Sequence, residues 1–170
     1  MAGYGLPKEQ HLSVVLQNSL EVEGHKIEII NGSVSGSTSA GGLNIAEWTL
    51  SQSNIDLMIL CLGANDMLRG INPKETKNNL EEIIQIAKNK KIKIIITGMI
   101  APTSYGSEYK ESFDKIFFNL SKEYNLQLIP FLLEGVAQKP EFNLSDGMHP
   151  NDQGTIIIGN TLKKAILENL

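Results

Sequence analysis

Residues 56–66 read Asp-Leu-Met-Ile-Leu-Cys-Leu-Gly-Ala-Asn-Asp, an apolar run that ends in a glycine and two short polar residues. A continuous apolar stretch of this length is typical of a parallel strand that is buried on both faces. The next such stretch, Lys93–Thr97, comes after a segment with apolar residues at helical spacing. A strand, a helix and a second buried strand in this order predict a parallel sheet.

The same alternation continues on both sides of this stretch. Apolar periodicity and terminal signals predict helices at Pro7–Glu23, Thr38–Ser51, Pro73–Lys90, Ser107–Tyr124 and Asp152–Leu170. The remaining apolar runs predict strands at Lys26–Asn31, Asp56–Leu62, Lys93–Thr97 and Leu126–Phe131. The order predicts an α/β fold, a doubly wound parallel sheet in a three-layer α/β/α arrangement. Ligands of such sheets bind beyond the carboxyl ends of the strands, so the residues after each strand are the ones of interest.

Length and composition indicate one ordinary globular domain, residues 1–170. The apolar fraction is 41% and the charged fraction 20%, which excludes a disordered or collagen-like chain. The net charge is −4 and there is no block of Lys and Arg, so we expect no nucleic-acid partner. No apolar run approaches the roughly 20 residues of a membrane span, so we expect no transmembrane anchor. The single cysteine, Cys61, excludes an internal disulfide and is typical of a buried small apolar residue.

The beginning of the chain is unusual for this fold class. Residues 1–5, Met-Ala-Gly-Tyr-Gly, form a glycine-rich loop that leads directly into a helix, although such domains usually begin with a strand. The pattern resembles the second half of a strand–loop–helix unit, and we therefore expect the domain to be truncated at its N-terminus. The start of the chain has no signal-peptide pattern, but a missing segment could carry one, so the compartment stays open.

The loop at residues 31–38 follows the first predicted strand and consists of small residues. Their backbone N–H groups, ahead of a helix, could bind an anion or an oxyanion. The other interpretation is a tight connection in which Thr38 caps the following helix. The loop is neither a P-loop nor a Gly-x-Gly-x-x-Gly motif.

Asn65 and Asp66 follow the second predicted strand. The Asn65 side chain could donate an N–H into the crevice at the sheet edge. Alternatively, both side chains turn the chain by bonding nearby backbone. The residues alone do not decide between these interpretations.

Asp146 and His149 stand three residues apart in a loop rich in glycine and proline. The Asp carboxylate can accept from His Nδ1–H, which fixes the tautomer and leaves Nε2 as a base. The alternative is a surface loop with an incidental histidine. His11 and His25 have no such neighbour, and we expect both to be solvated. No set of His, Cys and carboxylate residues has zinc-ligand spacing, so we expect no metal and no cofactor.

Together the three loops offer oxyanion donors, an Asn donor and an Asp–His pair. This set meets the needs of acyl transfer except for an activated nucleophile.

With these three loops, the chain resembles the SGNH hydrolases, also called GDSL-type lipases and esterases, over essentially its whole length. The branch it resembles is that of bacterial thioesterase/arylesterase/lysophospholipase enzymes, with a flavodoxin-like sheet topology. Three motif blocks carry the likeness: Gly36 in the small-residue loop, Gly63-Ala64-Asn65-Asp66, and Asp146-Gly147-Met148-His149-Pro150. The family's first block, Gly-Asp-Ser-Leu/Ile with the nucleophilic serine, is not in this sequence.

The resemblance implies a role for each matched residue. His149 would be the general base and then the acid, and Asp146 would orient it. The Gly36 N–H and the Asn65 side chain would be two oxyanion donors. Met1 would occupy the Ser/Thr place of the family's first region, two residues after the nucleophile. Ser35 and Ser37 flank Gly36, but we expect neither to replace a nucleophile held by another strand.

The expected function is a serine ester or thioester hydrolase that uses an acyl-serine intermediate and no cofactor. Its substrate would be a small acyl ester or a lipid-like molecule, and no protein partner is inferred. Because the nucleophilic serine is absent, we expect the chain as it stands to be inactive. The alternative is a non-catalytic remnant that binds a ligand or partner. A flavodoxin-like nucleotide binder would share the architecture, but the chain lacks a phosphate loop.

Overall fold

The structure is a computed structural model that describes residues 2–52 and 54–169. The chain forms two compact units. The first unit comprises residues 1–35 and 132–170, and the second unit comprises residues 36–131.

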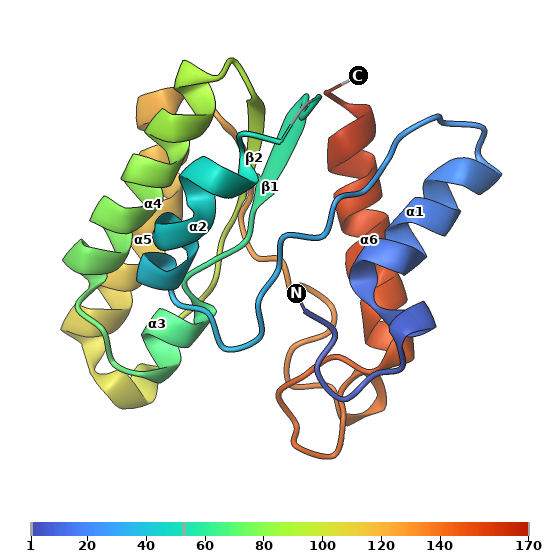
Figure 1. Cartoon of the computed structure of the whole chain (residues 1–170). Coiled ribbons are helices and arrows are strands. Elements are labelled where there is room, and N and C mark those ends of the chain that lie inside the picture. Colours follow the sequence, from blue (N-terminus) through green and yellow to red (C-terminus); the bar gives the residue numbers. More distant parts are fainter. Residues whose placement is uncertain (1, 53, 170) are drawn as a thin grey trace. The chain divides into compact units, whose positions relative to one another are not determined.

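The second unit is built around a parallel sheet of three strands. They are β1 (Leu57–Leu60), β2 (Lys93–Thr97) and β3 (Gln127–Ile129), in the order β1-β2-β3. Helices α2 (Ser39–Thr49), α4 (Pro73–Asn89) and α5 (Ser107–Tyr124) lie along one face of this sheet (Figure 1). Two short elements complete the unit, helix α3 (Ala64–Leu68) and the 3₁₀ turn η2 (Thr103–Tyr105). The predicted α/β class with a parallel sheet is confirmed.

The core of the second unit follows from the helical spacing of its apolar residues. The inner face of α4 and that of α5 are both buried, as the sequence predicts, and they pack against the sheet residues Ile94 and Ile96. The buried residues are Leu80, Ile83, Ile84 and Ala87 on α4, and Phe113, Ile116, Phe117 and Leu120 on α5. Helix α4 begins where Asn72 caps it, with its side chain accepting from the Lys74 N–H at 2.9 Å. Pro73 takes the first helical position, which needs no N–H donor.

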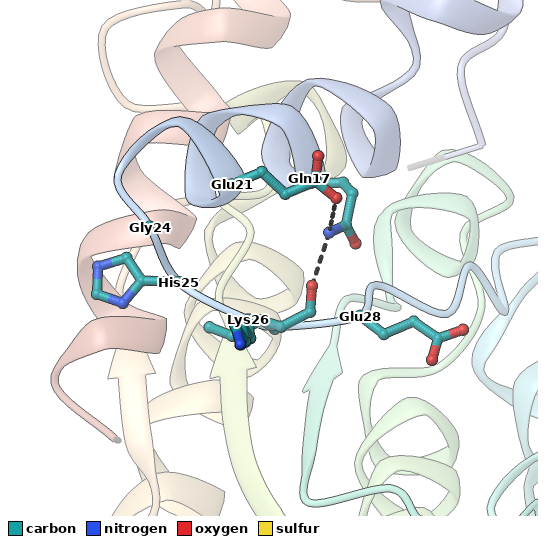
Figure 2. A pocket seen from close by; sticks show the side chains of 7 residues that line it. Gln17, Glu21, Gly24, His25, Lys26 and Glu28 are labelled. Carbon is teal, nitrogen blue, oxygen red and sulfur yellow. Dashed lines mark hydrogen bonds between the residues drawn. The ribbon is translucent and has the colours of Figure 1, made fainter.

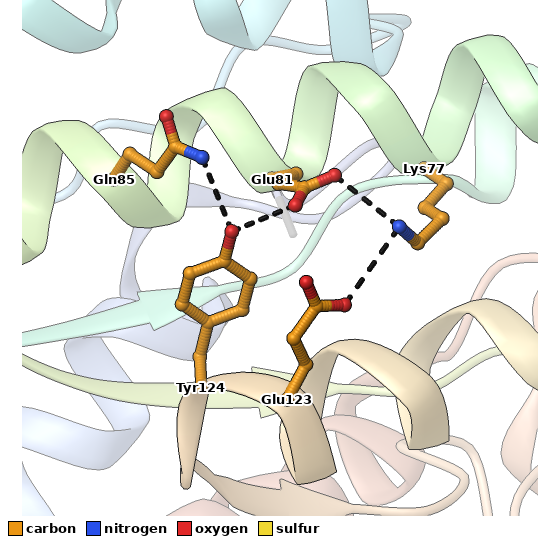
Figure 3. Close-up of polar contacts among 5 residues, drawn as sticks. All are labelled: Lys77, Glu81, Gln85, Glu123 and Tyr124. Carbon is orange, nitrogen blue, oxygen red and sulfur yellow. Dashed lines mark hydrogen bonds and ion pairs between the residues drawn. The ribbon is translucent and has the colours of Figure 1, made fainter.

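A polar cluster joins the outer sides of α4 and α5 (Figure 3). The Tyr124 hydroxyl donates to Glu81 at 2.7 Å and accepts from Gln85 Nε2 at 3.1 Å, while Lys77 Nζ lies 3.2 Å from Glu81. The hydrogen bond from Tyr124 is the main reason that the pKa of Glu81 is lowered. The bond from Gln85 lowers the pKa of Tyr124, but Glu81, burial and nearby charge outweigh it and raise that pKa overall.

The first unit packs helix α1 (Leu12–Val22) against helix α6 (Asp152–Leu167), as Figure 1 shows. Gly159 of α6 faces Val15 and Leu12 of α1 across this contact. Lys163 of α6 extends the contact, because its Nζ bonds Ser19 Oγ at 2.8 Å and Glu23 Oε1 at 2.5 Å. Two 3₁₀ turns, η1 (Lys8–Gln10) and η3 (Pro140–Phe142), complete the described elements.

The helix predicted at Pro7–Glu23 is divided in the structure. A 3₁₀ turn at Lys8–Gln10 is followed by His11 in an extended conformation, and α1 begins only at Leu12. At this break the His11 side chain contacts the preceding turn, since its Nε2 lies 3.0 Å from the Leu6 carbonyl oxygen. The expectation that His11 is solvated is therefore wrong, since the ring is half-buried and hydrogen-bonded.

The strand predicted at Lys26–Asn31 is wrong. The segment pairs with no strand among the described residues. Its partner is a side chain instead, because Gln17 Nε2 donates to the Ile27 carbonyl at 2.6 Å and Gln17 Oε1 accepts from the Ile29 N–H at 2.7 Å. One amide group thus reproduces a single rung of a parallel ladder. A strand needs a series of hydrogen bonds to a neighbouring backbone, and the side chain of one helix residue bonds the segment at only one position.

Gln17 and the segment it holds line a pocket of the first unit (Figure 2). The other lining residues are Glu21, Gly24, His25, Lys26, Ile27 and Glu28. Its charged side chains come from both the helix and the extended segment.

The other predicted elements match the structure to within a few residues, and α5 matches at both ends. The short helix α3 was not predicted. No helix in the described residues is both long and apolar enough to cross a membrane. Cys61 is half-buried rather than fully buried.

Candidate active site

The pair Asp146 and His149 is formed within a tight loop of the first unit. Asp146 Oδ2 lies 2.7 Å from His149 Nδ1. The other carboxylate oxygen accepts from the backbone N–H groups of Met148 at 2.8 Å and His149 at 2.9 Å. Gly147 lies between them at φ +68°, a conformation that a residue with a side chain rarely adopts. The sequence prediction that these two residues form a pair is confirmed.

Three donated hydrogen bonds hold Asp146 in its ionised form. The pKa of Asp146 is lowered to about 2, first by the backbone bond from His149, then by the bond from Met148 and by the His149 side chain. An ionised carboxylate favours the His149 tautomer with its proton on Nδ1. Nε2 is then the basic ring nitrogen, as a general base requires.

Backbone bonds close the loop that carries this pair. The Leu144 N–H donates to the His149 carbonyl at 2.7 Å, and Asn143 forms an antiparallel bridge with Pro150. Asn151 then starts α6, because its side chain accepts from the Gly154 N–H at 3.0 Å. The position of His149 is therefore set by the start of a helix and by a short bridge.

Gly36 and Asn65 lie together in the second unit, connected through Ser37. Asn65, in the first turn of α3, donates from Nδ2 to the Ser37 carbonyl at 2.9 Å. Arg69 Nη2 donates to the Gly36 carbonyl at 2.9 Å, and Gly36 has φ +74°. Within the described residues the Gly36 N–H has no hydrogen-bond partner. An amide nitrogen has two hydrogens, so Asn65 keeps a second N–H to donate.

Asp66 is the buried anchor of this arrangement. Its carboxylate accepts from the Ser39 N–H at 2.8 Å, from Ser39 Oγ, and from Thr76 Oγ1 at 3.2 Å. Asn79 Nδ2 donates to Ser39 Oγ at 2.9 Å. These bonds tie α3 to the first residue of α2 and to α4. The loop with Gly36 and the helix with Asn65 are thereby fixed to each other.

The structure answers part of the question about the small-residue loop. Thr38 caps α2, since its Oγ1 accepts from the Gly41 N–H at 3.3 Å. The capping interpretation is confirmed, and the donor role of Gly36 stays a prediction. The Ser37 hydroxyl donates to the Thr38 carbonyl at 3.3 Å. Met1, to which a place in the family's first region was given, lies outside the described residues.

Sequence reasoning missed the anchoring residues. Thr76 has a signal that could have found it, because it lies four residues before Leu80 and so on the buried face of α4. A polar residue on a buried face requires a partner, and that partner is Asp66. In the described residues, no three His, Cys, Asp or Glu side chains gather where they could hold a metal ion.

Residues 1–155 match the sequence pattern of the GDSL-like lipase/acylhydrolase family. The chain belongs to this family. The match includes the blocks around Gly36, Asn65 and His149, and it confirms the resemblance inferred from the sequence.

Two relatives and one solved structure show what this GDSL-like protein is similar to. An arylesterase of Vibrio mimicus is 34% identical over 169 residues, which span 99% of this chain and 84% of the relative. The thioesterase 1/protease 1/lysophospholipase L1 of Escherichia coli (strain K12) is 34% identical over 141 residues, 83% of this chain and 68% of the relative. The crystal structure of the psychrotrophic esterase EstA from Pseudoalteromonas sp., inhibited by monoethylphosphonate, has a TM-score of 0.93 at 29% identity. That comparison covers 98% of this chain and 91% of EstA.

Proposed function

We propose that this chain carries the proton-transfer and oxyanion-binding parts of a serine hydrolase that cleaves carboxylic esters and thioesters. The observation that carries the proposal is the Asp146–His149 pair, in a chain that belongs to a hydrolase family. An ionised carboxylate that orients an imidazole is the arrangement by which serine hydrolases remove a proton from their nucleophile.

In the proposed reaction, His149 Nε2 takes the proton of a serine hydroxyl as that oxygen attacks the acyl carbon. The carbonyl oxygen gains negative charge and accepts hydrogen bonds from the Gly36 N–H and the Asn65 side chain. The same His149 then gives its proton to the departing alcohol or thiol, and an acyl-serine remains. Water then attacks the acyl carbon as His149 Nε2 takes its proton, and His149 returns that proton to the serine oxygen as the carboxylic acid leaves. Asp146 stays ionised throughout and stabilises the imidazolium.

The serine itself is the part that the printed sequence does not supply. No Gly-Asp-Ser-Leu/Ile block occurs in residues 1–170. We propose that this chain does not hydrolyse esters unless such a block precedes it. Loss of the nucleophile costs about a million-fold in rate in one well-studied serine protease. Loss of a single oxyanion donor typically costs about 100- to 1000-fold.

The proposed substrates are small acyl esters, acyl thioesters and lysophospholipids. The names of the relatives support this range, since one is an arylesterase and another a thioesterase and lysophospholipase. The inhibition of EstA by monoethylphosphonate also fits, because a phosphonate is a tetrahedral mimic of the acyl-transfer intermediate.

A second candidate is a non-catalytic remnant that binds a ligand or partner. The absent nucleophile favours it. The retained pair at Asp146 and His149 argues against it, because a chain without catalysis has no chemical need for a base oriented by a carboxylate.

The test begins with the DNA directly upstream of Met1. Where an in-frame segment encodes Gly-Asp-Ser-Leu/Ile, the longer protein and the 170-residue chain are compared on p-nitrophenyl butyrate and on a short acyl thioester. The proposal expects turnover only by the longer protein, with loss of turnover when its serine or His149 becomes Ala. Turnover by the 170-residue chain that requires His149 would overturn the proposed inactivity. An in-frame stop codon, or a folded longer protein without turnover, would favour the remnant.

A further inference from the structure

Tyr4 packs against the imidazole of His149, although the two residues are far apart in the sequence. Their ring centroids lie 4.5 Å apart and the ring planes are inclined at 35°. Both residues belong to the first unit. The distance lies at the close end of the range for favourable aromatic contacts.

The loop that presents Tyr4 is held in place on both sides. The Leu6 N–H donates to the Gly3 carbonyl at 3.1 Å and closes a turn around Tyr4. Gly3 and Gly5 both have positive φ, +76° and +72°. A side chain at Gly3 would collide with the His11 ring, and His11 Nε2 in turn lies 3.0 Å from the Leu6 carbonyl.

The other side of the turn contacts the loop of the Asp–His pair. A side chain at Gly5 would collide with the Leu144 side chain. Leu144 donates its N–H to the His149 carbonyl at 2.7 Å. The turn with Tyr4 and the loop with His149 therefore share a packed contact in addition to the contact between the rings.

The Asp146–His149 pair needs such support because it is open to solvent. The side chain of His149 is 42% exposed and that of Asp146 is 37% exposed. Water competes with pairs as exposed as this, and many contribute little to holding a geometry. A ring against one face of the imidazole excludes water from that face and restricts rotation of the side chain.

We propose that Tyr4 is a positioning residue for His149: its ring keeps the imidazole turned so that Nδ1 stays on Asp146. The inference rests on the proposed role of His149 as the base. It adds a residue, from the other end of the chain, that sets the direction of the reactive nitrogen.

Nuclear magnetic resonance of the 170-residue chain, labelled with ¹⁵N and ¹³C at histidine, tests the proposal without hydrolysis. The variants are Tyr4→Leu, which removes the ring and keeps apolar bulk, and Tyr4→Phe, which keeps the ring. Tyr105→Leu is the matched control, because Tyr105 also packs against an aromatic ring, that of Tyr109 at 5.2 Å. The signals are the ring-current shift of the His149 Cε1 proton and the water exchange of its Nδ1 proton.

Tyr4→Leu is expected to abolish the ring-current shift and to speed exchange of the Nδ1 proton at least tenfold. Tyr4→Phe and Tyr105→Leu should leave both signals of His149 as they are in the parent chain. Unchanged Nδ1 exchange in Tyr4→Leu would overturn the proposal, since the ring would then be a neighbour without influence. General loss of amide dispersion in Tyr4→Leu would overturn it as well, by making Tyr4 a residue of fold stability. Because no readout needs turnover, these outcomes are independent of the hydrolase assay.

Discussion

Replacement of Asp66 by Ala should destabilise the second unit more than any other loss of a single carboxylate there. Asp66 is fully buried and accepts hydrogen bonds from the Ser39 N–H, the Ser39 hydroxyl and the Thr76 hydroxyl. The variant removes the acceptor and leaves these three donors in a site from which water is excluded. A buried donor without a partner costs about 1–3 kcal/mol.

The magnitude follows from what each donor can do instead. The Thr76 hydroxyl can turn to the carbonyl one helical turn earlier. The Ser39 hydroxyl loses the acceptor of its O–H but still accepts from Asn79, so it keeps one of its two hydrogen bonds. The Ser39 N–H has no such alternative. One full loss and two partial losses give about 2–4 kcal/mol less free energy of unfolding. That is a large fraction of the roughly 5–15 kcal/mol of a typical domain.

Urea unfolding followed by far-ultraviolet circular dichroism measures this change. Trp48 is 73% exposed, so its fluorescence is a poor reporter of unfolding. With a denaturant slope of about 2 kcal/mol per molar, the midpoint should fall by about 1–2 M. Glu82→Ala removes the same charge from an exposed position on α4 and should change stability by less than about 0.5 kcal/mol.

Two results would refute the reasoning about Asp66. One is a midpoint for Asp66→Ala within about 0.2 M of the parent chain, well below the expected shift. The other is an equal effect of Glu82→Ala, which would point to net charge rather than to buried hydrogen bonds. Asp66→Asn should fall between the parent chain and Asp66→Ala, because an amide keeps one acceptor oxygen and loses the other.

Three further outcomes follow from single contacts. The pKa of Asp146 is about 2 in the folded chain and near 3.9 in the unfolded chain. The ionised carboxylate therefore stabilises the folded chain above pH 4, and this contribution is lost as the pH falls towards 2. In Asp146→Asn the melting temperature should depend less on pH in that range. Gly63→Ala should lower the free energy of unfolding by about 1–3 kcal/mol in urea titrations, because Gly63 has φ +112° and a Cβ there would lie 3.1 Å from Phe117. Gln17→Leu should speed hydrogen exchange of the Ile29 amide at least tenfold, since the side chain is the acceptor for that N–H.

Each of these predictions has a result that contradicts it. If the melting temperature of Asp146→Asn falls between pH 4 and pH 2 as steeply as that of the parent chain, other carboxylates govern acid unfolding. Gly63→Ala as stable as the parent would show that the backbone relaxes at no cost. Unchanged hydrogen exchange of the Ile29 amide in Gln17→Leu would show that other contacts besides Gln17 hold the segment after α1. Gln10→Leu serves as the control, because Gln10 makes no side-chain bond to that segment.

The spacing of apolar residues along the sequence was enough to predict most of the helices and strands. The 3.6-residue spacing of apolar side chains fixed the inner faces of α4 and α5, because a helix is a local structure whose own residues make its hydrogen bonds. The strands β1 and β2 could also be predicted, as continuous apolar runs. The expectation that the first of them is fully buried is wrong, because only Leu60 of β1 is buried and its other residues are half-buried. The pairing of Asp146 with His149 also follows from sequence, since three residues in a tight loop leave little freedom.

Features that need a distant partner were decided only by the tertiary structure. Lys26–Asn31 alternates like a strand, yet strand formation depends on a neighbour, and the described neighbour is the amide of Gln17. Asp66 could have been a turn residue until its bonds to Ser39 and Thr76 showed a buried anchor. Tyr4 meets His149 only because the chain folds back on itself. Sequence thus determined what each segment can form from its own residues, while folding determined which polar groups and rings would meet, because those contacts join parts of the chain that have no local relation.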